Sequence, residues 1–481
     1  MGVLDSLQPE NVFRYFEQIC SIPHGSGNVE AISNYLCDFA KERGLWYKQD
    51  ENFNVIIKKT ASNAQSSAKP VILQGHIDMV AVKTDDKCKD MEKEGLDLIV
   101  EDGFVRADRT TLGGDDGIAV AYALAVLDSE ELIHPPVEAV FTVDEEIGML
   151  GASSIDLSCI DGNVMLNMDS EEEGVFLSGC AGGATLKGEY PVTTCSESGI
   201  KLDIRVTGLT SGHSGTDIIF QRANANIIMG RLLTAAGIDN INIIDISGGE
   251  KDNSIAPYAS VSILVRENVI ANVSENLETA IRELKNEYAV TDPDMDICFG
   301  GEKSVNADVY DEKSTAMVIN VLSLIPDGVV RMSNDIKGLV QTSLNLGVMR
   351  GDNRLFTATY LIRSSVESEK KCLIDKVAKL TCILGGRFNL TGVYPAWEFK
   401  RDSVIRNVIC DSYKELFGKE AKVETIHAGV ECGIMAAKIA ELDCVSFGPD
   451  IRDIHTVKER LDIASTKRTW ELIVNVLEKL A

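Results

Sequence analysis

Basic residues are scarce relative to acidic ones in this chain of 481 residues. Lysine and arginine together number 47 and aspartate and glutamate number 74, which leaves a formal charge of −27. Nucleic acids and anionic membranes attract proteins through lysine and arginine, so we expect neither as a general partner. The hydrophobic fraction of 44% and the charged fraction of 25% are those of a folded globular protein.

Three other signals are missing. None of the 12 cysteines is spaced as CxxC, which favours buried thiols in a reducing compartment over a disulfide framework. The N-terminal segment contains Asp5 and Glu10 and no long apolar run, so no secretory signal is expected. The longest apolar stretch, residues 117–127, is too short to span a bilayer. We therefore expect a soluble, cytoplasmic protein.

The first part of the chain alternates apolar strand-like runs with helical patterns. Residues 70–74, 137–143 and 164–168 are short apolar runs typical of buried strands, and residues 119–127 follow a helical pattern. Strands that alternate with helices in this way predict an α/β fold with a mixed, largely parallel sheet.

The pattern changes after about residue 187. Residues 199–206 alternate between apolar and polar side chains, which is typical of strands with one face in solvent. At about 150 residues per domain, this length predicts two or three domains. We predict a discontinuous catalytic-type α/β domain, residues 1–186 and 396–481, with an inserted α+β domain, residues 187–395.

Histidine is rare, and two of the six histidines occur in a set of five acidic segments. Each segment follows an apolar run or begins a helix; the five are residues 75–78 (GHID), 113–117 (GGDDG), 144–148 (DEEIG), 167–169 (NMD) and 453–455 (DIH). In α/β sheets, ligands bind in the crevice beyond the carboxyl ends of the strands. Carboxylates that meet there repel one another and need a cation. Two histidines with several carboxylates suit Zn²⁺, Mn²⁺ or Co²⁺ better than Ca²⁺.

The spacing within two of these segments adds chemical detail. Residues i and i+2 of a strand point to the same side, so His76 can bind a metal while Asp78 accepts a hydrogen bond from its other ring nitrogen. The neighbours Glu145 and Glu146 point in different directions, so one can bind a metal while the other transfers a proton. Each segment alone is common in ordinary turns, and only their joint occurrence favours a metal site.

Taken together, the motifs of this chain resemble the M20 family of metallopeptidases, and within it the aminoacyl-histidine dipeptidase branch, which includes cytosolic non-specific dipeptidases. The motifs run through nearly the whole chain: residues 74–80 (QGHIDMV), 111–119 (TLGGDDGIA), 142–149 (TVDEEIGM), 166–170 (LNMDS), 211–215 (SGHSG) and 427–433 (HAGVECG). One departure is Asp116, where the branch often has asparagine. The resemblance implies a two-metal catalytic domain and an inserted lid domain.

The resemblance also implies the metal ligands. Asp115 would bridge two divalent ions, His76 and Asp169 would complete one site, and Glu146 and His455 would complete the other. We expect Zn²⁺, with Co²⁺ or Mn²⁺ as alternatives.

Two further residues take catalytic roles in the family. The resemblance implies that Asp78 orients His76 and that Glu145 is the general base. A bound metal lowers the pKa of water from about 16 to about 7, which makes hydroxide available near neutrality. Glu145 would take the proton and deliver it to the leaving amine.

A dipeptidase must recognise a free terminus of its substrate. Arginine is the best clamp for a carboxylate, because it makes two parallel hydrogen bonds. The resemblance implies four substrate-binding residues: His213, Asn253, Arg363 and Gly429. His427 and Glu431 lie close to Gly429 in the sequence, and no role is assigned to them.

The leading hypothesis is a two-metal dipeptidase of broad specificity, with Xaa-His dipeptides such as carnosine among its substrates. The resemblance also suggests a homodimer formed through the lid. The alternatives are another M20 amidohydrolase, such as a tripeptidase or an N-acyl-amino-acid deacylase, and a non-catalytic metal-binding protein. A metallophosphoesterase would normally carry several histidine-rich motifs late in the chain, where only His427 and His455 occur.

Overall fold

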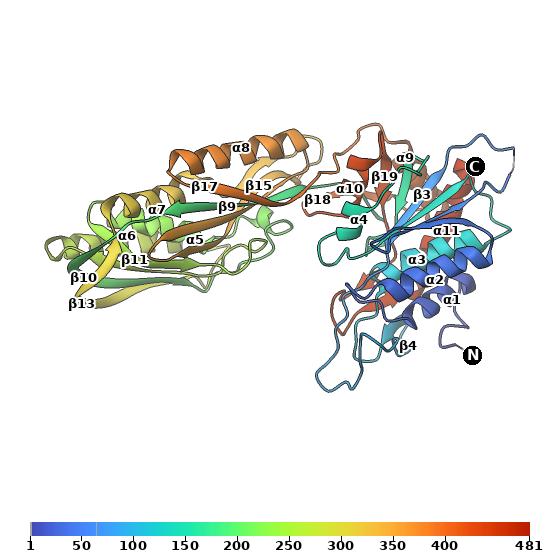
Figure 1. The fold of residues 1–481 in the computed structure, drawn as a ribbon, viewed down its shortest axis with the longest axis horizontal. Helices are drawn as coiled ribbons and strands as arrows, with labels where there is room; N and C mark the ends of the chain where they lie inside the picture. The colour runs from blue at the N-terminus through green and yellow to red at the C-terminus, as the bar shows by residue number, and fades with distance from the viewer. Residues whose placement is uncertain (1, 64) are drawn as a thin grey trace. The chain divides into compact units, whose positions relative to one another are not determined.

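The computed structural model describes residues 2–63 and 65–481, which form two compact units (Figure 1). Unit 1 contains the residues up to 179 together with 399–425 and 430–481, and unit 2 contains residues 180–398 and 426–429. The sequence placed the inserted domain at 187–395; unit 2 begins earlier because the strand that starts at Gly182 pairs with strands of that unit. Each unit has its own hydrophobic core.

Unit 1 contains a main sheet, a small second sheet and seven helices among its described residues. The main sheet has the order β1 (Trp46–Gln49), β2 (Val55–Lys59), β6 (Val137–Thr142), β3 (Val71–His76), β7 (Val164–Asn167), β19 (Asp443–Ser446), β8 (Val175–Cys180) and β18 (Lys422–Ile426). The small sheet has the order β20 (Ile451–Arg452), β21 (Arg460–Asp462), β5 (Phe104–Ala107) and β4 (Leu98–Glu101). The helices are α1 (Glu10–Cys20), α2 (Glu30–Glu42), α3 (Gly114–Asp128), α4 (Leu150–Ser154), α9 (Val404–Phe417), α10 (Glu431–Lys438) and α11 (Ile463–Leu480).

The centre of the main sheet of unit 1 is parallel. β3 pairs in parallel with β6 and β7, and β19 pairs in parallel with β7, whereas the β1–β2 and β2–β6 pairs are antiparallel. Every residue of β3 and β6 is buried, as expected for strands covered on both faces. α3 packs against β3 and α1, and its residues from Gly114 to Leu127 are all buried. A helix that is apolar on every face is typically buried in this way. This mixed sheet confirms the predicted fold class.

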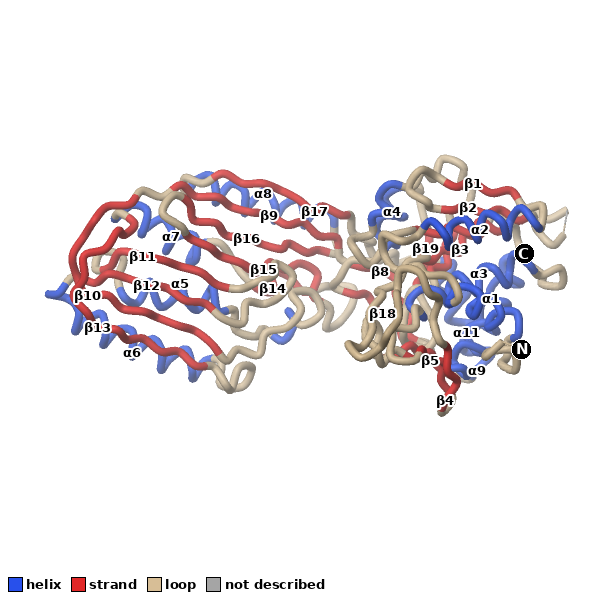
Figure 2. The backbone as a smooth tube through the Cα atoms, turned by 60° about the horizontal axis from the view of Figure 1, so that its bottom comes forward, coloured by secondary structure: helices blue, strands red, loops and turns tan. Residues whose placement is uncertain are grey.

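Unit 2 is built on one large antiparallel sheet (Figure 2). The strand order is β13 (Asp296–Tyr310), β10 (Thr194–Thr207), β12 (Ala259–Val265), β11 (Ile241–Gly248), β15 (Val340–Gly351), β16 (Leu355–Ser364), β9 (Gly182–Pro191) and β17 (Arg387–Tyr394), and β14 (Gly328–Met332) pairs with β15. The helices are α5 (Ala225–Ala236), α6 (Ile270–Glu287), α7 (Glu312–Leu324) and α8 (Glu367–Ile383), with short 3₁₀ turns at Ile218–Phe220 and Glu267–Val269. α5, α7 and α8 pack against the sheet, and α6 packs against α5.

The alternation predicted at residues 199–206 falls in β10. Leu202, Ile204 and Val206 are buried, whereas Arg205 between them is exposed. One face of this strand therefore contributes to the core of unit 2. Among the described residues, no helix has the length and apolar character needed to cross a bilayer.

Candidate functional site

Three of the acidic segments of unit 1 follow the parallel strands β3, β6 and β7, which end at the same edge of the sheet. β3 ends at His76, which is paired with Thr142 at the end of β6. Asn167 at the end of β7 is paired with Gln74 of β3. Because parallel strands end at one edge, the turns that follow them meet there. The parallel register thus places His76, the turn with Glu145 and Glu146, and Asp169 side by side.

Two histidines face the two carboxylate oxygens of Asp115. His76 Nε2 lies 3.1 Å from Asp115 Oδ1, and His455 Nε2 lies 3.1 Å from Asp115 Oδ2. His76 Nε2 is also 3.6 Å from Asp169 Oδ1, and His455 Nε2 is 2.9 Å from Glu146 Oε1. The five residues predicted as metal ligands therefore lie together as two groups that share Asp115.

This cluster contains more negative charge than its histidines can balance. Burial raises the pKa of Asp169 well above its usual range. Burial, reinforced by neighbouring carboxylates, raises the pKa of Glu145 to about 8. Hydrogen bonds to two carboxylates raise the pKa of His455 to about 10. The raised pKa values mean that these side chains hold protons, which offset the negative charge of the carboxylates. A divalent cation bound between the same side chains would offset that charge instead. The donor set therefore fits a metal centre.

Asp116, the departure from the family pattern, forms a group with His76 and Asp169 whose ligand atoms all lie within 4.8 Å of one another. Its Oδ2 accepts a hydrogen bond of 3.2 Å from the main-chain N–H of His76. Burial, together with the charge of Asp169, raises the pKa of Asp116 well above its usual range. A raised pKa favours the protonated form of Asp116, which has the same charge as asparagine.

Asp78 makes contacts that differ from the expectation. His76 Nδ1 lies 3.0 Å from the main-chain oxygen of Asp78 and 3.6 Å from its carboxylate, so the carbonyl is the acceptor that orients the imidazole. The reason is that β3 ends at His76, so the side-chain alternation of a strand does not extend to Asp78. The carboxylate instead accepts hydrogen bonds from the amides of Glu145 (3.0 Å) and Glu146 (3.4 Å) and from the hydroxyl of Ser26 (2.8 Å). It therefore holds the turn that carries both glutamates.

Glu431 belongs to unit 1 and connects two of its strands. Its buried Oε2 accepts hydrogen bonds of 2.6 Å from Gln74 Nε2 in β3 and from Thr142 Oγ1 in β6. Burial raises the pKa of Glu431 to about 7. Sequence reasoning missed this role, because the partners are 357 and 289 positions away.

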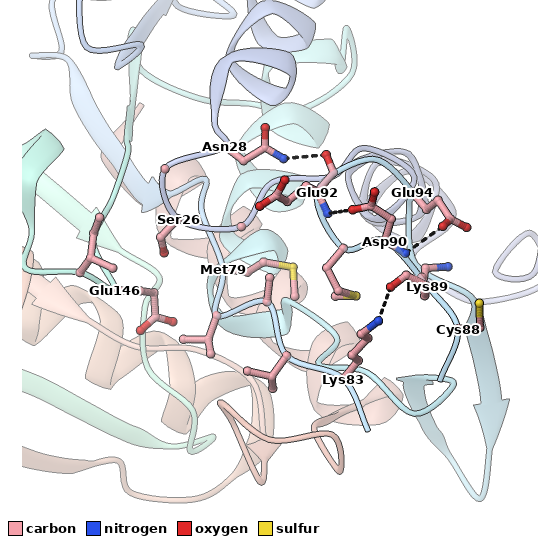
Figure 3. A pocket seen from close by; sticks show the side chains of 17 residues that line it. Ser26, Asn28, Met79, Lys83, Cys88, Lys89, Asp90, Glu92, Glu94 and Glu146 are labelled. Carbon is pink, nitrogen blue, oxygen red and sulfur yellow. Dashed lines mark hydrogen bonds between the residues drawn. The ribbon is translucent and has the colours of Figure 1, made fainter. Parts of the chain in front are cut away.

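A cavity of about 1210 Å³ adjoins Glu146 in unit 1 (Figure 3). Its lining comes from residues 25–28, 79–83 and 88–92 and from Glu94, Glu146 and Ile147. In the view of Figure 3, Glu146 lies toward one end, and Glu94 and Cys88 lie toward the other. The volume is sufficient for a small-molecule ligand next to Glu146 of the acidic cluster.

The four predicted substrate-binding residues lie in unit 2, and two of them are in contact. Arg363, in β16, is buried, and its Nη1 donates a hydrogen bond of 2.8 Å to the hydroxyl of Tyr394. Its Nη2 lies 3.5 Å from Nε2 of His213. Its Nε is buried and has no hydrogen-bond partner within the described ranges. This buried guanidinium therefore has donor capacity left for a ligand, and Tyr394 is a further member of the cluster that the motifs did not predict.

Asn253 and Gly429 are also fixed in unit 2. The main-chain oxygen of Asn253 accepts a hydrogen bond of 2.9 Å from the amide of Ser214. The side chain of Asn345 donates to the main-chain oxygens on either side of Asn253, at 2.8 and 2.9 Å. A Cβ atom at Gly429 would lie 2.6 Å from the ring of Tyr394, so only glycine fits there.

His427 joins the same cluster, in which burial favours the neutral form of both imidazoles. His427 Nε2 lies 2.8 Å from the hydroxyl of Ser343. Burial lowers the pKa of His427 to about 3 and also lowers the pKa of His213, and the charge of Arg363 adds to both effects. Arg363 therefore supplies the positive charge of this cluster, which fits an anion.

Comparisons with known proteins agree with the motifs. Residues 72–479 match the model of peptidase family M20/M25/M40. The chain is 33% identical to the cytosol non-specific dipeptidase of Escherichia coli K12, over 100% of this chain and 99% of that protein. The crystal structure of aminoacylhistidine dipeptidase from Vibrio alginolyticus has a TM-score of 0.93 at 34% identity, over 99% of this chain and 98% of that one. Aminopeptidase PepT from Bacillus cereus shares the fold, with a TM-score of 0.56 at 15% identity over 98% and 99% of the two chains.

Proposed function

The chain belongs to peptidase family M20/M25/M40, and on this premise we propose that it is a metal-dependent dipeptidase. The observation that carries the proposal is Asp115, whose two oxygens face two different histidines at 3.1 Å each. A carboxylate in this position can bridge two ions. The full-length similarity to a dipeptidase supports the choice of dipeptides as substrates.

We assign two divalent ions to unit 1. His76, Asp115 and Asp169 would hold one, and Asp115, Glu146 and His455 would hold the other. Imidazole and carboxylate ligands suit Zn²⁺, and also Co²⁺ and Mn²⁺; we propose Zn²⁺ as the native ion. Bound ions of this kind lower the pKa of water to about 7 and polarise a carbonyl oxygen.

Glu145 is assigned as the general base. Its turn is held by the hydrogen bond from its amide to Asp78, which directs its carboxylate without occupying it. A carboxyl group whose pKa is raised toward neutrality can accept a proton from water and later donate it to the leaving amine. Asp78 is assigned as a residue that positions both His76 and Glu145.

The cluster in unit 2 is assigned to the terminal carboxylate and the carbonyl oxygen of the substrate. Arg363 would bind the carboxylate, because its buried Nε and its Nη groups form the planar fork that matches two oxygens. His213, Asn253 and the main chain of Gly429 would hold the rest of the peptide unit. Unit 2 is thus proposed as the lid and the substrate-binding domain.

Three finer features belong to the same proposal. Xaa-His dipeptides are proposed as substrates, supported by the similarity to the Vibrio aminoacylhistidine dipeptidase. A cytoplasmic location is supported by the similarity to a protein named as cytosolic. A homodimer through unit 2 is supported by the edge strand β17, which is largely exposed and carries the exposed apolar residues Phe388 and Val393.

A substrate panel tests the proposal. The purified chain, loaded in turn with Zn²⁺, Co²⁺ or Mn²⁺, is assayed with Xaa-His and other dipeptides, their C-terminal amides, tripeptides and N-acyl amino acids. We expect dipeptides with a free carboxylate to be cleaved fastest and a chelator to stop the reaction. Preference for tripeptides or N-acyl amino acids would assign one of the other amidohydrolase activities, and no cleavage with any metal would make this a non-catalytic metal-binding protein.

A further inference from the structure

Glu459 makes an unusual set of contacts with the turn that precedes Asp115. Its side chain is buried, with 3% of the residue exposed. Its Oε2 accepts hydrogen bonds from the amides of Leu112 (2.7 Å) and Gly113 (3.2 Å), and its Oε1 accepts one from the amide of Gly114 (2.8 Å). One carboxylate therefore binds three consecutive main-chain N–H groups directly before the shared ligand.

Glycine at position 114 makes this approach possible. A Cβ atom at Gly114 would lie 3.3 Å from Oε1 of Glu459, which is tighter than ordinary van der Waals contact. Gly113 has a φ of +68°, in the left-handed region that favours glycine. The two glycines let the main chain turn around the carboxylate and present its amides to it. Charge-assisted hydrogen bonds of this kind are about twice as strong as neutral ones.

Glu459 is also joined to His455 through a short turn. Its amide donates to the main-chain oxygen of Thr456 at 3.1 Å, and the hydroxyl of Thr456 donates to the main-chain oxygen of Asp453 at 2.7 Å. Asp453 and His455 have φ values of +56° and +60°. Such strained conformations of non-glycine residues persist only where the surroundings hold them. The turn therefore gives His455 a fixed direction relative to Glu459.

From these contacts we propose that Glu459 is a positioning residue that locks together the two segments that carry Asp115 and His455. It touches neither metal nor substrate in the assignment above, and it acts by holding His455 Nε2 and Asp115 Oδ2 at 3.1 Å. The two segments are about 340 positions apart in the chain. The carboxylate of Glu459 would hold them in the same relative position whether or not the ion is bound. The proposal rests on the proposed metal centre.

The test compares Glu459→Gln and Glu459→Ala with a matched control, Glu138→Gln. Glu138 is equally buried in unit 1, with 2% exposed; its carboxylate accepts hydrogen bonds from the amides of Asp161 and Gly162 and pairs with Lys58 at 2.7 Å. No proposed ligand lies at its contacts. Each full-length variant is freed of metal and titrated with Co²⁺, and the visible absorption of the bound ion gives the affinity. Melting temperature and dipeptide kinetics are measured on the same samples.

We expect both Glu459 variants to bind the ion of the Asp115–Glu146–His455 group about 10- to 100-fold more weakly, the usual effect of losing an outer support of a metal ligand. Turnover should fall at limiting Co²⁺ and return when Co²⁺ is raised, with KM for the dipeptide unchanged. Glu138→Gln should lower the melting temperature and leave the Co²⁺ affinity as in the wild type. If Glu459→Ala does not fold, Glu459→Gln, which keeps the volume, decides the result.

Two outcomes would overturn the role of Glu459. One is wild-type Co²⁺ affinity in a folded Glu459→Gln variant. The other is an equal loss of affinity in Glu138→Gln, which would mean that affinity follows general stability. A wild-type chain that binds Co²⁺ but cleaves no dipeptide would contradict the proposed function, while the comparison of affinities would still decide the role of Glu459.

Discussion

Unit 1 and unit 2 each gather buried polar residues in one place, but with opposite charge. In unit 1, carboxylates collect where parallel strands end, and burial raises the pKa of Asp169 and of Glu145. In unit 2, a buried arginine lies next to imidazoles whose pKa values are lowered, on an antiparallel sheet. The first arrangement fits a cation and the second fits an anion. The net charge of −27 describes neither of them.

A dipeptide has one group for each of these arrangements. A metal ion can polarise its scissile carbonyl, and an arginine can bind its terminal carboxylate. The proposed function therefore places the chemical step in unit 1 and recognition of the carboxylate in unit 2. Changes in the acidic cluster of unit 1 should lower kcat, and changes in the arginine cluster of unit 2 should raise KM.

The largest effect is expected for Glu145→Ala. Loss of a general base lowers kcat by about 10²- to 10⁴-fold, while two ions per chain should still bind, because Glu145 is not assigned as a ligand. Steady-state kinetics and metal analysis check both points, with Glu130→Ala, an exposed glutamate of unit 1, as the control. Wild-type turnover in Glu145→Ala would remove the catalytic role from this residue.

Arg363→Ala should act on recognition. Losing a hydrogen bond to a charged group costs about 1.5–3 kcal/mol, which corresponds to a rise in KM of roughly 10- to 150-fold. The same variant should match the wild type on dipeptide amides, which lack the carboxylate. Arg205→Ala, an exposed arginine of β10, is the control. An equal rise in KM for dipeptides and for dipeptide amides would show that Arg363 does not bind the carboxylate.

Tyr394→Phe should have a smaller effect in the same direction. It removes the hydroxyl that accepts the 2.8 Å hydrogen bond from Arg363 Nη1 and leaves the ring that packs on Gly429. One hydrogen bond is worth about 0.5–1.5 kcal/mol, so KM should rise roughly 2- to 12-fold. Tyr258→Phe removes an exposed hydroxyl of unit 2 bonded to Glu250 and serves as the control. A fold decrease in kcat that exceeds the fold increase in KM would contradict a role of Tyr394 in orienting Arg363.

The smallest effect concerns the neutral imidazole of His427. Burial holds its pKa at about 3 in the folded chain, against about 6.5 in the unfolded chain. Only the unfolded state takes up this proton, so the contribution of His427 to stability is present above about pH 6.5 and is lost as the pH falls. His427→Gln lacks this proton uptake.

Melting temperatures of both proteins test this sign. Between about pH 7.5 and pH 5, the wild type should lose more stability than His427→Gln, by about 2–4 °C for each kcal/mol. Identical pH dependence of the two proteins would mean that His427 is not buried in its neutral form.

The strands of unit 1 could be predicted because their signals are local. The apolar runs at 70–74, 137–143 and 164–168 correspond closely to β3, β6 and β7. The five acidic segments followed from the same signals, since each lies at or just past the end of an apolar run or begins a helix. The family motifs then supplied the pairing of the ligands around Asp115.

The contacts that could not be predicted join residues far apart in the chain. Glu459 reaches amides that lie 345 to 347 positions before it, and Glu431 reaches Gln74 over 357 positions. The role of Asp78 was predicted from strand alternation and from the family resemblance, but β3 ends at His76, and the main-chain carbonyl of Asp78 is the partner of His76 in place of the carboxylate. Such details depend on tertiary packing, which local patterns do not contain.

The most direct test of the central claim is a metal titration of the apo-protein. The chain is freed of metal with a chelator, and Zn²⁺ or Co²⁺ is added in steps while dipeptide hydrolysis and bound metal are measured. We predict no turnover without metal and full turnover when two ions per chain are bound. Full turnover of the metal-free chain would contradict the assignment of the acidic cluster in unit 1 as the catalytic centre.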